Sequence, residues 1–146
     1  MFFKKKHFFT DEEKKLLVQE ITDAEAMTSG EIRVHIEPNC KIDVLKRATE
    51  VFRKLKMDKT KHANGVLIYI AHDDKKLAIL GDKGINTVVP ANYWEDIKEV
   101  MREHFKKGEY YGGTAFAIRE TGSHLKQYFP HQRDQQNELP NEISEG

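Results

Sequence analysis

The sequence predicts an α/β fold, a three-layer α/β/α sandwich with a mixed, mostly parallel central sheet flanked by helices. Helix-type and strand-type patterns follow one another in the order helix, strand, helix, strand, strand, helix, helix. Residues 66–71 are almost continuously apolar, which is typical of a central strand covered on both faces. A strand–helix–strand passage forms a right-handed parallel crossover, and the short polar turn after residue 71 favours an antiparallel hairpin.

The first helix is expected over residues 11–27, because Thr10 and Glu13 have the spacing of a capping box. Residues 31–37 then alternate polar and apolar side chains, which predicts a strand with one buried face and one polar or lightly covered face.

The second helix is expected after Asp43, where apolar residues form one stripe through Leu55. Residues 77–80 predict the third strand, which completes the hairpin. Pro90 suits the first turn of the next helix, and the last helix is expected over residues 110–129.

The composition indicates one domain without disulfides. The chain has 146 residues, 24 Lys and Arg against 24 Asp and Glu, and a single cysteine, Cys40. The balanced charge argues against a dedicated nucleic-acid binder, and one cysteine permits neither an internal disulfide nor a cysteine-based zinc site. We expect a monomer with an aromatic and basic lead-in at residues 1–9, a domain at residues 10–130, and a disordered tail at residues 131–146.

The N-terminal segment lacks the apolar run of a secretory signal, and no stretch is long and apolar enough to span a membrane. We therefore expect a soluble, cytoplasmic protein. The segment carries four phenylalanines, which we expect to pack onto the domain in preference to a membrane surface: Phe2, Phe3, Phe8 and Phe9.

No familiar catalytic motif occurs in the sequence, and no catalytic residue is assigned. The predicted topology instead gathers polar residues at the two ends of the sheet. Glu31, Asn64 and Asp82 share one end, and oxygen ligands from separate segments are what Ca²⁺ and Mg²⁺ prefer. The other end, which ligands usually occupy in open α/β sheets, gathers Glu37, Asn39, Cys40, His72, Asp73 and Asp74. These residues alone leave the choice between the two ends open.

Four segments, residues 28–34, 64–71, 76–85 and 105–113, together resemble the TPM domain family in its order of blocks. The resemblance covers about residues 8–129 and is strongest to stand-alone bacterial members that lack a signal peptide and an anchor. It implies the same α/β/α sandwich and divalent-cation binding, chiefly of calcium. In a plant branch of the family it implies acid phosphatase activity, and in other relatives an accessory role in membrane complexes.

The resemblance favours the Glu31 end of the sheet. Asn64 and Gly65 match the family's polar-glycine entry to the central strand, and residues 81–85 match its glycine loop. Many anchored members carry an aspartate where this chain has Pro90, and Glu95 or Asp96 in the following helix would have to replace it.

Three functions follow as hypotheses. The first is a Ca²⁺- or Mg²⁺-binding domain without strong catalytic activity, whose weak metal site consists of Glu31, Asn64, Asp82 and Glu95. The second is a metal-dependent phosphomonoester hydrolase in which Lys83 neutralises phosphate charge. The third is an interaction module for an unidentified protein partner, with the N-terminal phenylalanines as its contact surface.

Overall fold

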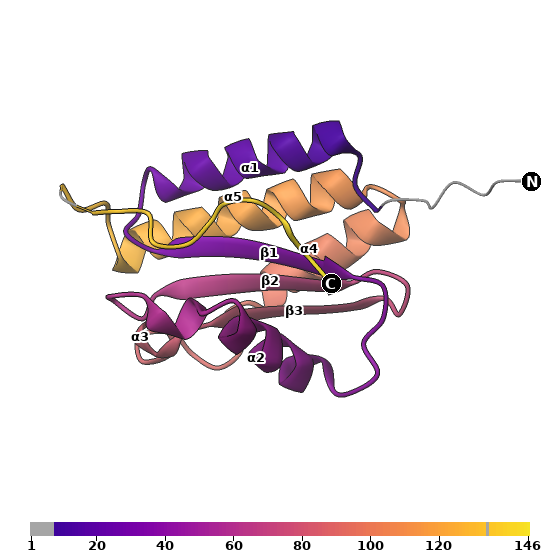
Figure 1. Ribbon diagram of the computed structural model, residues 1–146, viewed down its shortest axis with the longest axis horizontal. Helices are drawn as coiled ribbons and strands as arrows, with labels where there is room; N and C mark the ends of the chain where they lie inside the picture. Colours follow the sequence, from indigo (N-terminus) through magenta and orange to yellow (C-terminus); the bar gives the residue numbers. More distant parts are fainter. Residues whose placement is uncertain (1–7, 134) are drawn as a thin grey trace, which may run out of the picture.

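The computed structural model, shown in Figure 1, describes residues 8–133 and 135–146. Its elements follow the predicted order, with two short helices and a fourth strand in addition. They are α1 (Asp11–Glu25), β1 (Glu31–Glu37), α2 (Val44–Lys54), the 3₁₀ helix η1 (Met57–Lys59), β2 (Gly65–Ala71), β3 (Lys76–Gly81), α3 (Lys83–Asn86), α4 (Glu95–Lys106), α5 (Tyr110–Tyr128) and β4 (Ser144–Glu145).

Within the described residues the sheet has four strands in the order β3-β2-β1-β4. β1 pairs with β2 in parallel, with Glu31 opposite Gly65, and β2 pairs with β3 in the predicted antiparallel hairpin. β4 adds a second parallel neighbour to β1. The sheet is therefore mixed and mostly parallel, as predicted.

Helices cover both faces of the sheet, which confirms the three-layer sandwich. Alternation along β1 sends Ile32, Val34 and Ile36 into a core formed with α1, α4 and α5. On the opposite face, Leu67 and Tyr69 of β2 pack against α2 and η1. Figure 1 shows α1 and α5 side by side on the first face, and the C-terminal segment passing in front of α5 and β1 in this view. Its strand β4 lies beside β1 in the sheet.

The helix boundaries differ little from the expected ones. At the start of α1 the side chain of Thr10 accepts from the Glu13 amide at 3.0 Å and the Glu13 side chain accepts from the Thr10 amide at 2.9 Å, which confirms the capping box. Pro90, however, does not lie in a first helical turn. It belongs to a turn in which its carbonyl accepts from the Tyr93 amide, and α4 begins only at Glu95.

The segment expected to be a disordered tail is instead packed along β1. Leu139 is 7% exposed and joins the core on the α2 face, and the Ser144 and Glu145 of β4 pair with His35 and Ile36. The C-terminal segment needs few apolar residues to attach to the domain. Its backbone pairs with β1, and its amides donate to the side chain of Glu31 on β1. Because the C-terminal segment lies against β1, all seven residues of β1 are buried, including those of its polar face.

The described part of the N-terminal lead-in packs onto the domain. Phe9 is fully buried in the core, and Phe8 stacks on His72 with ring centroids 4.7 Å apart. Phe2 and Phe3 lie outside the described residues. Over the described residues, none of the helices has the length and apolar character needed to cross a bilayer.

Candidate functional site

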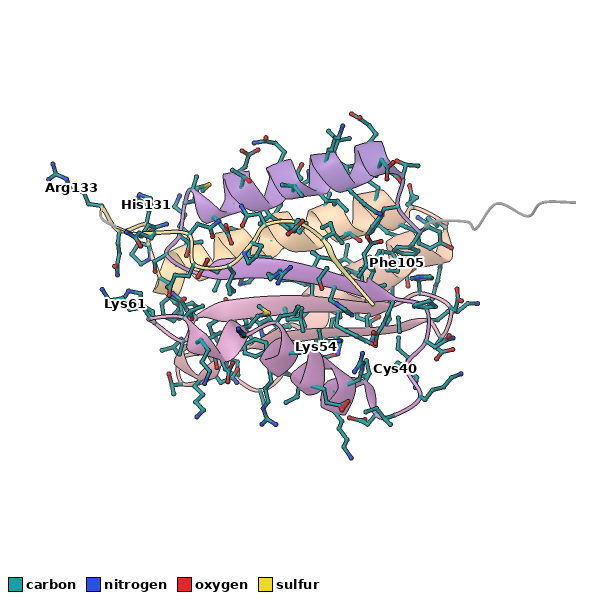
Figure 2. The ribbon with its side chains drawn as sticks, viewed as in Figure 1. Cys40, Lys54, Lys61, Phe105, His131 and Arg133 are labelled. Carbon is teal, nitrogen blue, oxygen red and sulfur yellow. The ribbon has the colours of Figure 1, made fainter. Side chains whose placement is uncertain are left out.

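Three of the four predicted metal ligands lie at one end of the sheet. The amide of Glu31 donates to the Asn64 carbonyl at 3.4 Å, and the amide of Asp82 donates to the Gly65 carbonyl at 3.0 Å. β1, β2 and the end of β3 are therefore adjacent here, as the parallel pairing of the first two strands requires. Figure 2 labels Lys61 at this end of the molecule and Cys40 and Phe105 at the opposite end.

The side chain of Glu31 is held by the C-terminal segment. Its Oε1 accepts hydrogen bonds of 2.7 Å from the amides of Glu138 and Leu139. Glu31 is 3% exposed, and burial raises the pKa of its carboxyl group above the ordinary value. Its Oε2 is buried without a hydrogen-bond partner in the described part of the chain. One carboxylate oxygen thus anchors the C-terminal segment.

Met57 separates Glu31 from Asp82. Glu31 and Asp82 lie on either side of β2, about 10 Å apart at the backbone because two strand spacings intervene. Met57 is fully buried and packs on Gly65 between them: a Cβ at Gly65 would meet the Met57 Cε at 3.5 Å. The two carboxylates therefore occupy different surroundings at the same end of the sheet.

Asp82 faces a hollow of about 520 Å³ whose lining includes Asp58, Ala63 and Gly81. Its Oδ1 caps α3 by accepting from the Lys83 amide at 2.7 Å. Its Oδ2 is buried and has no hydrogen-bond partner among the residues described. A buried carboxylate oxygen without a donor is costly, and a cation in the hollow would relieve that cost. The same hollow is also lined by Arg53, Lys59 and Lys83, which limits how strongly it attracts a cation.

The other two predicted ligands have protein partners. The Asn64 side chain donates to the Ser29 hydroxyl at 3.3 Å, and Asn64 is 1% exposed. Glu95 starts α4, where its half-exposed carboxylate pairs with Lys98 at 3.1 Å. Across the described residues no group of three or more His, Cys, Asp or Glu side chains is arranged to hold a metal ion.

At the opposite end of the sheet the acidic residues bind to the protein itself. The Asp74 carboxylate accepts from the Cys40 amide at 2.7 Å and from the Asn39 side chain at 3.2 Å. His72 and Asp73 contact each other at 3.1 Å. This arrangement stabilises the turn between β2 and β3, and it offers no oxygen comparable to the free Oδ2 of Asp82.

A network of polar side chains on the α2 face of β1 was missed at the sequence level. The carboxylate of Glu37 accepts from the Arg47 guanidinium, from the Tyr69 hydroxyl and from His35 at 3.1 Å. The Arg47 hydrogen bonds lower the pKa of Glu37 to about 2, and burial lowers the pKa of His35. Alternation did place Glu37 and His35 on one face. Nothing in the sequence indicated that the C-terminal segment covers that face, with Ser144 2.9 Å from His35.

Comparison with known proteins places the chain in a family. A family description, the TPM domain, matches residues 3–124. The chain belongs to the TPM domain family. Among solved structures, the NMR structure of the BA42 protein from the psychrophilic bacterium Bizionia argentinensis is similar, with a TM-score of 0.90 and 49% sequence identity over 98% of this chain and 99% of that one. A search of curated proteins finds no match.

A second solved structure shares the fold alone. The solution NMR structure of the N-terminal domain of a protein from P. gingivalis has a TM-score of 0.71 and 15% identity, over 86% of this chain and 83% of that one. A shared fold at this low identity does not determine function, which depends on the side chains of each protein.

Proposed function

We propose that this TPM domain binds one divalent cation, Ca²⁺ or Mg²⁺, weakly and without turnover, with Asp82 as its principal ligand. The observation that carries the proposal is that Asp82 lines a hollow and that its buried Oδ2 lacks a hydrogen-bond partner among the described side chains. Hard cations bind oxygens from separate segments, and two aspartates from separate segments, Asp58 and Asp82, line this hollow.

Asp58 is the second carboxylate that we assign to this site. It comes from η1, lines the same hollow as Asp82, and lies 3.8 Å from the ammonium of Lys59. No sequence pattern indicates it, because its place in the same hollow as Asp82 depends on how η1 packs. Of the four ligands expected from the sequence, Asp82 is thus retained as the centre. Glu31 is assigned to the C-terminal segment, since a shared ion would have to displace Met57.

The site should be weak. It offers two carboxylates against three cationic side chains in the same lining, Arg53, Lys59 and Lys83. Cation sites with few charged ligands and open access have dissociation constants of about 10⁻⁴ to 10⁻³ M. The domain is then suited to respond to large changes in cation concentration, and a tightly held structural metal is not expected.

An NMR titration of ¹⁵N-labelled protein with CaCl₂ and MgCl₂ tests the proposal. Asp82→Asn is the informative variant, because asparagine still caps a helix and so preserves the contact to the Lys83 amide. We expect wild-type shifts centred on residues 58–63 and 81–84, and binding about tenfold weaker in Asp82→Asn.

Asp73→Asn is the matched control. It removes the same charge from an exposed aspartate at the opposite end of the sheet, and it should titrate like the wild type. Equal cation affinity of Asp82→Asn and the wild type would refute the proposal, as would shifts confined to residues 72–75.

A further inference from the structure

A second hollow, of about 500 Å³, lies where the end of α2 and η1 meet the C-terminal segment. Asp82 is not among its lining residues. Figure 2 labels Lys54 on the face of the molecule where α2 and the C-terminal segment lie. The lining is strongly basic and consists of Arg33, Lys54, Leu55, Lys56, Lys59, Thr60, Glu138, Leu139 and Pro140.

Arg33 is a buried cation without an ion-pair partner within 4.0 Å in the described part of the chain. It is 7% exposed, and its Nη2 reaches only the Glu142 carbonyl, at 3.4 Å. Its Nε is buried without a hydrogen-bond acceptor among the described residues. Burial lowers the pKa of the guanidinium. A buried charge left unpaired in this way is strongly unfavourable, so the fold retains an energetic cost at Arg33 that an anion would offset.

Thr60 provides a second unsatisfied group in the same hollow. It is 8% exposed, and its Oγ1 is buried with no partner among the residues described. Thr60 follows η1 whereas Arg33 is on β1, so two separate segments each contribute to the lining of this hollow a residue with an unpaired polar atom. A hydroxyl can donate to one oxygen while a guanidinium donates to others.

Most of the remaining charge around the hollow is positive, against two carboxylates: Glu138 in the lining, and Glu142, whose charge acts on Arg33. Lys54, Lys56 and Lys59 line it with Arg33, and the carboxylate of Glu138 already accepts from the Lys61 amide at 3.2 and 3.1 Å. Lysines are common near helix C-termini because their charge interacts favourably with the helix dipole, so the lysines alone would not indicate a binding site. Together with the buried Arg33 and Thr60 they form a cationic rim around two unsatisfied donors.

We propose that this hollow binds a small tetrahedral oxyanion, a phosphate or sulfate group, between Arg33 and Thr60. Arginine matches such oxyanions because its guanidinium presents several N–H donors in a fixed plane. The Thr60 hydroxyl donates to a further oxygen, and the three lysines supply long-range attraction. This site is independent of the cation at Asp82, since it needs no metal and shares only Lys59 with the hollow of Asp82.

Titration of the metal-free protein in Tris chloride with sodium phosphate and with sodium sulfate tests the proposal, with sodium chloride at equal ionic strength as the reference. We expect saturable amide shifts at residues 33, 54–56 and 60. Arg33→Met should weaken binding at least about tenfold. Its melting temperature should be unchanged or higher, because an apolar side chain of similar length replaces an unpaired buried charge.

Lys54→Gln and Lys46→Gln form a matched pair on α2. Both remove one lysine charge, but only Lys54 lines the hollow. Lys54→Gln should weaken binding about threefold, and Lys46→Gln should leave it unchanged. Equal oxyanion affinity of Arg33→Met and the wild type would overturn the proposal. So would identical shifts in sodium chloride, or equal effects of the two lysine variants. Because no divalent cation is present, none of these results bears on the Asp82 site.

Discussion

Glu37 on β1 accepts two hydrogen bonds from Arg47 on α2, at 2.8 Å from Nε and 2.9 Å from Nη2. Glu37 is 5% exposed, and the Tyr69 hydroxyl donates to the same carboxylate. This pair joins the sheet to the helix that covers it, on the face where the polar side chains of β1 are buried. It therefore stabilises the layer that also carries both proposed ligand sites.

Glu37→Gln should destabilise the protein by about 3 kcal/mol at pH 7, because it breaks a buried ion pair and leaves its partners unsatisfied. Urea unfolding measures the change. Glu50→Gln is the control, since Glu50 contacts the same Arg47 at 3.8 Å but is exposed, and it should change stability by at most about 0.5 kcal/mol. Equal losses in the two variants would contradict the assigned role of Glu37.

Because of the same pair, we expect the protein to lose stability at acid pH. The pKa of Glu37 is about 2 in the folded protein against an ordinary value of 4.5. The folded state therefore holds fewer protons there, and the stabilisation present above pH 4.5 is lost as the pH falls towards 2. Wild-type unfolding free energies between these pH values should decline more steeply than those of Glu37→Gln.

Glu25 should give folding stability the opposite pH dependence, at higher pH. Burial raises its pKa from 4.5 to about 7, so the folded state holds an extra proton in this range and stability falls as the pH rises from 4.5 to 7. Glu25→Gln should remove this slope and stabilise the protein at pH 8 by on the order of 2 kcal/mol. Glu12→Gln, on the exposed side of the same helix, should retain the wild-type slope; a slope that persists in Glu25→Gln would contradict the assignment.

Leu139 tests whether the C-terminal segment is part of the fold. Leu139→Ala should cost about 2–3 kcal/mol, because the side chain is buried against the α2 face of the sheet. Leu45→Ala is the control, since Leu45 is 52% exposed, and thermal unfolding should hardly change. A melting temperature unaffected by Leu139→Ala would show that the segment is not packed there.

Gly84 tests the backbone beside Asp82. A Cβ at this position would lie 2.5 Å from the His62 carbonyl oxygen and 2.6 Å from that of Ala63, so the loop before β2 would have to move. Gly84→Ala should destabilise the protein by about 1–3 kcal/mol and weaken Ca²⁺ binding. Gly112→Ala is the control. A Cβ at Gly112, in α5, would have its nearest contact at 3.6 Å, with His104, and this variant should stabilise the protein by up to about 1 kcal/mol. Unchanged stability of Gly84→Ala would contradict the close approach.

The fold could be predicted because each core element carries its own local signal. The capping box at Thr10, the alternation in β1 and the apolar run of β2 each specified a local structure, and the crossover rule assembled them. The C-terminal segment could not be predicted, because its attachment depends on the Glu31 carboxylate and the edge of β1, which no local pattern in the segment itself reveals.

The candidate site could be predicted only to the level of one end of the sheet. Strand order placed Glu31, Asn64 and Asp82 together, but the position of Met57 over Gly65 and the approach of Asp58 to Asp82 result from tertiary packing of η1. Arg33 was likewise indistinguishable in the sequence from an exposed strand residue. Its burial follows from the C-terminal segment that covers it.

Paramagnetic broadening by Mn²⁺ tests the central claim most directly, because Mn²⁺ accepts the same oxygen ligands as Mg²⁺ and Ca²⁺. At substoichiometric Mn²⁺ we expect amide signals to be lost first at residues 58–59 and 81–84, and to be restored by excess Ca²⁺. Broadening centred on residues 72–74, or on Glu31 and residues 138–139, would show that the cation binds elsewhere and that Asp82 is not its ligand.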